Sequence, residues 1–201
     1  MTGLEIGLDG PASVDAGSAF KVKWTGPAAR YDDVQIYREG VNGAEGEVMR
    51  AARIVQDPGF DQKTVELIAP SKDGTYQLRY WNGEDNKVLV AKPLTVVAIE
   101  IAIDAPASVD MGSTFLASWK GPGARYDDIQ IGPSGSDSAL FSARIPQDEK
   151  FAEKKVTLIA PVKPGSYDLR YWAGEDSKVL LSRPIEVKEI PVTLAAPEKV
   201  K

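Results

Sequence analysis

Apolar and polar residues alternate with a period of two along most of the chain, in short runs separated by Gly, Pro and Asp. No segment shows sustained helical periodicity. Alternation of this kind predicts half-buried β-strands. The first three such runs, each ended by a turn or a loop, are Leu4-Ile6-Leu8, Phe20-Val22-Trp24 and Val34-Ile36.

Further strands follow after a loop at residues 39–47 that is rich in Gly and Glu. They are expected near Val48–Ile54, at Thr64–Ile68, through Tyr76, Leu78 and Tyr80, and at Val88–Val90, with a hairpin loop at Asn82–Asp85. About seven or eight short strands in roughly 90 residues, with turn signals every 8–12 residues, are typical of an immunoglobulin-like β-sandwich. The predicted fold class is therefore all-β.

The pattern occurs twice. Ile6–Ile36 aligns with Ile101–Ile131 with 20 of 31 positions identical, and Val65–Pro93 aligns with Val156–Pro184 with 19 of 29 identical. The second copy is four residues shorter, and this deletion lies near the loop at 39–47. We expect two tandem sandwiches, repeat 1 at 1–98 and repeat 2 at 99–188. A tail at 189–201 resembles the first strand of a third repeat, which suggests a longer array.

Two local features support this assignment. Asp73-Gly74-Thr75-Tyr76 resembles the tyrosine corner of immunoglobulin domains, with Leu78 at the position of the disulfide cysteine, and Pro164 to Leu169 repeats the pattern. Trp24 and Trp119 each end an alternating strand, which predicts that both are buried between the sheets.

The junction at 95–101 contains no Gly, Pro or Ser, so we expect a semi-rigid rod.

Composition narrows the possible functions. The net charge of −5 disfavours nucleic acid as a partner, and no apolar stretch is long enough to span a membrane. The chain contains no cysteine and no histidine, so the commonest catalytic base and thiolate metal ligands are missing. No enzyme activity and no cofactor are expected. A hydrolase using a carboxylate pair is the weakest of three alternatives.

The run Ala105 to Phe115, followed by Trp119-Lys120-Gly121-Pro122, Arg170-Tyr171-Trp172 and Lys178-Val179-Leu180, resembles immunoglobulin-like repeats found in bacterial von Willebrand factor A-domain proteins. The resemblance covers each repeat nearly end to end. It implies a non-catalytic role in a periplasmic or cell-surface protein. The A domain's Asp-x-Ser-x-Ser metal motif is not in this sequence, so metal-dependent adhesion is not implied.

One candidate interaction surface lies on the outer face of a sheet. If Tyr76, Leu78 and Tyr80 point inward, their neighbours on the strand point outward. The expected partner-binding residues are Gln35, Arg79, Trp81, Gln130, Arg170 and Trp172. Exposed Trp and Arg anchor protein interfaces, and aromatic rings also stack on sugars. The alternative is local packing, in which Trp81 covers its hairpin and Arg79 stacks on it.

A second candidate is acidic. The loops after the second and sixth strands lie at one end of an immunoglobulin sandwich, and both carry carboxylates. In repeat 2 they are Asp127, Asp128, Glu175 and Asp176, a weak candidate for a Ca²⁺ site that should face repeat 1. In the alternative, Arg125 and Lys178 neutralise these acids; in repeat 1, Arg30 and Lys87 pair with the acids and Asp32 caps a turn.

The sequence thus favours a spacer and interaction module that binds a protein or neighbouring domains of its own chain. The rival interpretation is a carbohydrate-binding module that uses the exposed Trp and Arg side chains, with a glycan as its partner.

Overall fold

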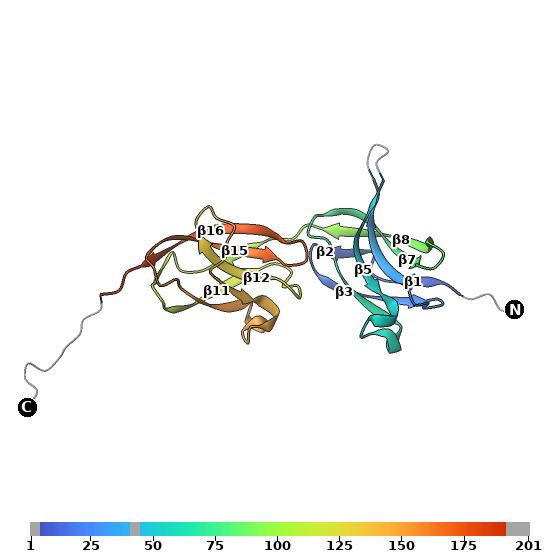
Figure 1. Cartoon of the computed structure of the whole chain (residues 1–201), viewed down its shortest axis with the longest axis horizontal. Coiled ribbons are helices and arrows are strands. Elements are labelled where there is room, and N and C mark those ends of the chain that lie inside the picture. Colours follow the sequence, from blue (N-terminus) through green and yellow to red (C-terminus); the bar gives the residue numbers. More distant parts are fainter. Residues whose placement is uncertain (1–4, 41–44, 192–201) are drawn as a thin grey trace, which may run out of the picture. The chain divides into compact units, whose positions relative to one another are not determined.

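The computed structural model describes residues 5–40 and 45–191, and it confirms an all-β chain of two immunoglobulin-like sandwiches (Figure 1). The strands of repeat 1 are β1 (Gly7–Asp9), β2 (Ser13–Asp15), β3 (Ala19–Thr25), β4 (Asp33–Arg38), β5 (Glu47–Arg53), β6 (Thr64–Ile68), β7 (Gly74–Asn82) and β8 (Lys87–Val97). Those of repeat 2 are β9 (Ala102–Asp104), β10 (Ser108–Asp110), β11 (Thr114–Lys120), β12 (Asp128–Pro133), β13 (Phe141–Arg144), β14 (Lys155–Ile159), β15 (Gly165–Ala173) and β16 (Lys178–Lys188). The described residues also form four short 3₁₀ helices, η1 to η4, at Ile54–Gln56, Phe60–Gln62, Ile145–Gln147 and Phe151–Glu153.

Each repeat contains a sheet of three strands and a sheet of five. The orders are β1-β3-β6 and β2-β8-β7-β4-β5 in repeat 1, and β14-β11-β9 and β10-β16-β15-β12-β13 in repeat 2. The fifth strand, β5 or β13, joins the larger sheet beside β4 or β12. The deletion in repeat 2 lies between these two paired strands, where a surface loop tolerates a change of length.

The first strand of each sandwich is split between the two sheets. β1 pairs antiparallel with β3, whereas β2 pairs parallel with β8. The crossing point is Gly10-Pro11, where a side chain on Gly10 would lie 3.2 Å from Leu78 Cδ1. This close approach to the core favours a small residue at the crossing.

Both predicted core tryptophans are buried, which confirms that expectation. Trp24 is 5% exposed and Trp119 is 3% exposed. The ring of Trp24 stacks on Phe60 of η2, and that of Trp119 stacks on Phe151 of η4, each at a centroid distance of 5.8 Å. The 3₁₀ helices therefore close the core with a second aromatic ring.

The tyrosine corner is also confirmed. The Tyr76 hydroxyl donates to the Lys72 carbonyl oxygen at 2.8 Å, and the Tyr167 hydroxyl donates to the Lys163 carbonyl oxygen at 2.9 Å. Leu78, at the cysteine position, is 1% exposed. Apolar packing thus takes the part that a disulfide has in many immunoglobulin domains.

The chain divides into two compact units whose limits differ from the repeats. Unit 1 contains residues 1–100 together with two loops, 121–127 and 173–178; unit 2 contains the remainder. The boundaries inferred from the repeat and the semi-rigid rod stay predictions. Leu4 and residues 192–201 of the tail lie outside the described residues.

Candidate functional site

The outer face of the five-stranded sheet has the predicted alternation. On β7, Tyr76, Leu78 and Tyr80 are buried, while the residues between them are half-buried and lie on the opposite face. Across the sheet, Gln35 pairs with Arg79 in repeat 1, and Gln130 pairs with Arg170 in repeat 2. The strands therefore bring the six candidate partner-binding residues to the expected face.

Exposure on that face is lower than expected: the expectation that Gln35 and Arg170 are exposed is wrong, while partner binding by the six residues stays a prediction. Gln35 is 8% exposed and Arg170 is 4% exposed. The Arg170 guanidinium donates to the Pro133 carbonyl oxygen at 2.8 Å and to the Ser138 carbonyl oxygen at 3.3 Å. A buried arginine held by two backbone carbonyls is a structural group rather than an exposed anchor.

The two repeats differ here because repeat 1 has Tyr37 at the position where repeat 2 has Gly132. Tyr37 lies under the Arg79 guanidinium, 3.3 Å from ring centroid to Cζ, so Arg79 stacks on Tyr37 and not on its own hairpin tryptophan. Gly132 has no side chain, and the Ser138 carbonyl oxygen fills the space instead, since a side chain at this position would lie 2.1 Å from it. The shorter loop of repeat 2 closes over Arg170 in place of an aromatic ring.

A buried carboxylate supports the loop after β3. Asp32 is completely buried; its Oδ2 accepts the Ala29 N–H at 2.9 Å and the Tyr80 hydroxyl at 2.9 Å. The Tyr80 oxygen in turn accepts the Ala28 N–H at 3.0 Å. Burial, with a small contribution from Asp32, raises the pKa of the Tyr80 hydroxyl far above its ordinary value. The expectation that Asp32 caps a turn is confirmed.

In repeat 2, Asp127 has the corresponding role. Its Oδ2 accepts the Ala124 N–H at 2.9 Å, and its Oδ1 accepts the Gly174 N–H at 3.3 Å. Asp127 thereby ties the loop at 121–127 to the loop at 173–178 within unit 1.

Asp33 and Asp128, which follow Asp32 and Asp127 in the chain, pair with two arginines for which the sequence predicted no such role. Arg53 on β5 forms an ion pair with Asp33, and Arg144 on β13 forms one with Asp128 at 2.7 Å. Burial raises the pKa of the Asp128 carboxyl, and Arg144 opposes part of that rise. The sequence contained a hint of these ion pairs, since the arginine and the aspartate recur in both repeats. Spacing alone, however, does not show that β5 lies beside β4.

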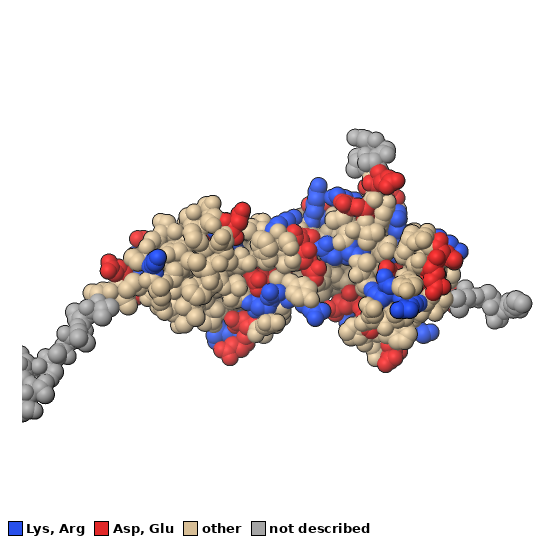
Figure 2. All heavy atoms as spheres, in the orientation of Figure 1, with Lys and Arg blue, Asp and Glu red and all other residues tan. Residues whose placement is uncertain are grey.

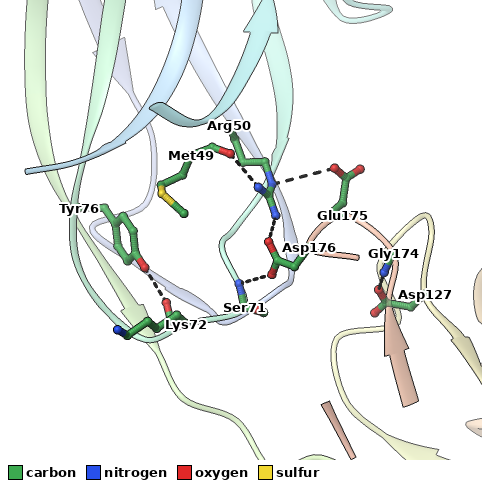
Figure 3. A network of polar contacts seen from close by, with 9 residues as sticks. All are labelled: Met49, Arg50, Ser71, Lys72, Tyr76, Asp127, Gly174, Glu175 and Asp176. Atoms are coloured by element: carbon green, nitrogen blue, oxygen red, sulfur yellow. Dashed lines mark hydrogen bonds and ion pairs between the residues drawn. The ribbon is translucent and has the colours of Figure 1, made fainter. Parts of the chain in front are cut away.

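Unit 1 contains a second group of ionic contacts, which we call the clasp: Arg50, Ser71, Glu175 and Asp176 (Figure 3). One Asp176 oxygen accepts from the Arg50 guanidinium, and the other accepts the Ser71 N–H at 2.9 Å. Arg50 Nε lies 4.0 Å from Glu175 Oε2. Burial raises the pKa of the Asp176 carboxyl, but the bonds from Ser71 and Arg50 outweigh it and leave the pKa below its ordinary value.

These contacts differ from the expectation that Arg125 and Lys178 neutralise the acidic residues of repeat 2. Asp176 is bound by Arg50 and Asp128 by Arg144, whereas Arg125 stacks on the ring of Tyr126. In repeat 1, Lys87 pairs with Asp85 at 3.5 Å as expected, while Arg30 stacks on the Tyr31 ring.

Three further properties of the described residues bear on function. They contain no group of three or more acidic side chains arranged to hold a metal ion, and calcium binding by the acidic loops of repeat 2 stays an untested alternative. No helix in that part of the chain is long and apolar enough to cross a membrane. On the visible surface, Lys and Arg are mixed with Asp and Glu rather than gathered in a basic patch (Figure 2).

No protein-family model matches the chain, and no curated protein matches it. Several solved structures resemble it. The polymeric Ig receptor ectodomain of a teleost fish is 13% identical, with 94% of this chain and 100% of that chain covered and a TM-score of 0.31. Fibronectin(III)-like modules of CbhA from Clostridium thermocellum are 11% identical, covering 97% and 100%, with a TM-score of 0.30.

A third structure, SGBP-B of the Bacteroides ovatus mixed-linkage glucan utilization locus, is in complex with a mixed-linkage heptasaccharide. It is 13% identical with a TM-score of 0.31, and the match covers 89% of this chain and 43% of that chain. The assignment of the fold rests on the strand order of this chain itself.

Proposed function

We propose that the chain is a non-catalytic spacer and interaction module of a bacterial envelope or cell-surface protein. Its tandem sandwiches hold other domains of the same protein at a defined separation. The clasp is the observation that carries this proposal. It lies in the compact unit that joins residues 1–100 to loops 121–127 and 173–178, and it combines an ion pair with a backbone hydrogen bond.

The clasp suits a mechanical role because it is shielded from water. The Arg50 side chain is 16% exposed and that of Asp176 is 17% exposed. Arg50 also donates to the Met49 carbonyl oxygen at 2.7 Å, which fixes the guanidinium in one orientation. An ion pair with restricted side chains and little solvent is worth more than a mobile surface pair.

Small-angle X-ray scattering of the wild-type chain and of Asp176→Ala tests this function. We expect one narrow distribution of interdomain angles for the wild type and a broader one for the variant. Asp85→Ala, a change in the equivalent loop of repeat 1, is the matched control and should leave the distribution unchanged. A broad ensemble for the wild type would contradict the spacer function.

The envelope or surface location is part of the proposal and rests on the resemblance to repeats of bacterial von Willebrand factor A-domain proteins. Immunoblotting of fractionated source cells tests it. We expect the protein in the periplasmic or surface fraction, and recovery in the cytosolic fraction would reject this part.

Carbohydrate binding is the second candidate. Trp81 and Trp172 are half-buried on the outer sheet face, which leaves part of each ring for stacking on a sugar. The burial of Gln35 and Arg170 removes two of the polar groups that would orient a glycan. A polysaccharide pull-down with the wild type and a Trp81→Ala/Trp172→Ala variant distinguishes the two functions, because retention that depends on the tryptophans would favour the carbohydrate module.

A further inference from the structure

The Gly-Glu-Asp turn that supplies the acidic half of the clasp occurs twice in the chain, at Gly174-Glu175-Asp176 and at Gly83-Glu84-Asp85. Asp176 is engaged by Arg50 and by the Ser71 N–H. Asp85 contacts Lys87 of its own loop at 3.5 Å, and its side chain is 63% exposed. The same chemical group is therefore buried in one repeat and presented to solvent in the other.

The two turns have the same backbone. Each follows the seventh strand and precedes the eighth, and the residue after the aspartate has a positive φ, 50° at Asn86 and 49° at Ser177. In both, the glycine packs on a tyrosine: a side chain on Gly83 would lie 2.1 Å from the Tyr31 carbonyl oxygen. Glu84 and Asp85 are thus presented on the same scaffold as the pair that forms the clasp.

The basic half of the clasp has a definite chemistry. It needs an arginine on the strand beside β4, which Arg50 supplies from β5. It also needs an accessible backbone N–H in the turn after β6, which Ser71 supplies. Arg50 pairs across the sheet with Ile36, so its position in the fold is fixed by the strand register.

Repeat 2 lacks the arginine that this receiving chemistry needs. Phe141 pairs with Ile131 as Arg50 pairs with Ile36, so a phenylalanine stands at the arginine position. Val162 stands at the Ser71 position and is 73% exposed, while Phe141 is 39% exposed. Repeat 2 of a second copy would therefore meet Glu84 and Asp85 with apolar side chains, which cannot satisfy their charges, and Arg50 of its repeat 1 is already bound to Asp176.

We propose that Glu84 and Asp85 form a docking site for another immunoglobulin-like domain, one that presents an arginine and a turn N–H at the positions of Arg50 and Ser71. This inference rests on the proposed spacer function and names the chemistry of the neighbour. In the docked state, Asp85 accepts hydrogen bonds from that arginine and that N–H, as Asp176 does in unit 1.

The test uses the full chain with its own repeat 1 added in front. Residues 6–100 are duplicated so that Ile6 follows Glu100 of the added copy, just as Ile101 follows Glu100 in the natural chain. The added copy then offers its Arg50 and Ser71 to Glu84 and Asp85. Segmental ¹⁵N labelling of the added copy allows amide hydrogen exchange to be measured at its Ser71 alone.

We expect Asp85→Ala to speed exchange of that Ser71 N–H by about tenfold or more, and Asp85→Asn, which keeps an acceptor oxygen, to have a smaller effect. Asp176→Ala, the matched control, should do the same to Ser71 of the natural repeat, measured in a second sample in which the natural repeat carries the ¹⁵N label. In the chain without the added copy, Asp85→Ala should leave the unfolding midpoint unchanged.

The outcomes separate the two ideas. If Asp85→Ala leaves exchange at the added Ser71 unchanged while Asp176→Ala speeds it at the natural Ser71, the docking site is wrong and the spacer function stands. If neither substitution has an effect, the clasp itself fails. Sedimentation of the unextended chain adds a third test, because self-association that Asp85→Ala abolishes would show that the occupant is a second copy.

Discussion

Removing the Tyr80 hydroxyl by Tyr80→Phe should destabilise repeat 1 by about 2–4 kcal/mol. The hydroxyl makes two buried hydrogen bonds, one donated to Asp32 Oδ2 and one accepted from the Ala28 N–H. A bond to a charged group contributes about 1.5–3 kcal/mol, and a neutral bond contributes about 0.5–1.5 kcal/mol. Water does not relieve the loss, because Asp32 is completely buried, and its second oxygen, Oδ1, has no hydrogen-bond partner among the described residues.

Tyr76→Phe is the matched control. It deletes the same type of atom from the same strand, and Tyr76 is 2% exposed, so both hydroxyls are removed from buried tyrosines. Its hydroxyl makes one bond, to the Lys72 carbonyl oxygen near the surface. The expected cost is about 0.5–1.5 kcal/mol.

Urea unfolding followed by circular dichroism at pH 7 measures both variants. The chain contains two compact units, so the curve is fitted with a transition for each, and both substitutions should move the same transition. Equal costs for the two variants would refute the reasoning, because they would mean that the buried Asp32 carboxylate does not depend on its tyrosine.

Four further predictions concern the core, the charged groups and calcium. Trp24→Ala should cost about 3–5 kcal/mol in urea unfolding, as for other large buried aromatics, and an unchanged midpoint would show that the core is assigned wrongly. Because the pKa of Tyr80 is raised above 10.0, its contribution is present below pH 10 and is lost above it, so Tyr80→Phe should flatten the alkaline decline in the unfolding free energy. The lowered pKa of Asp176 has the opposite effect on the pH dependence. Its contribution to the unfolding free energy is present above the ordinary pKa of 3.8 and is lost as pH falls through the folded pKa. Arg50→Gln should therefore flatten the acid decline in the unfolding free energy. Millimolar Ca²⁺ against EDTA should leave the midpoint unchanged, whereas a shift of several degrees that Asp128→Asn abolishes would establish a calcium site.

The sandwich could be predicted from sequence because its determinants are local. Period-two alternation assigns Trp24 to the core from the pattern of one strand. The tyrosine corner is encoded within a few residues of Tyr76. Neither inference requires knowledge of which strands are neighbours.

The contacts of a charged side chain depend on strands and loops that are distant in sequence, and these contacts could not be predicted. Alternation placed Arg170 on the outer face correctly, but it could not show that the shorter loop of repeat 2 covers this side chain. The relevant signal was the glycine at position 132 where repeat 1 has Tyr37. Arg50 was missed for a related reason, since half-buried and exposed residues on β5 do not alternate regularly.

These differences between the repeats have a common consequence for an array. The acidic turns are the same in both repeats, but the surfaces that could receive them differ: Arg50 in repeat 1 corresponds to Phe141 in repeat 2. A charged turn buried against a phenylalanine would lose its hydration without gaining an ion pair, which is unfavourable. On the docking proposal, a domain with an arginine can therefore precede a Gly-Glu-Asp turn, and a domain with a phenylalanine cannot. Substitutions at this one position would then determine the order of domains in the array, while the buried strands remain interchangeable.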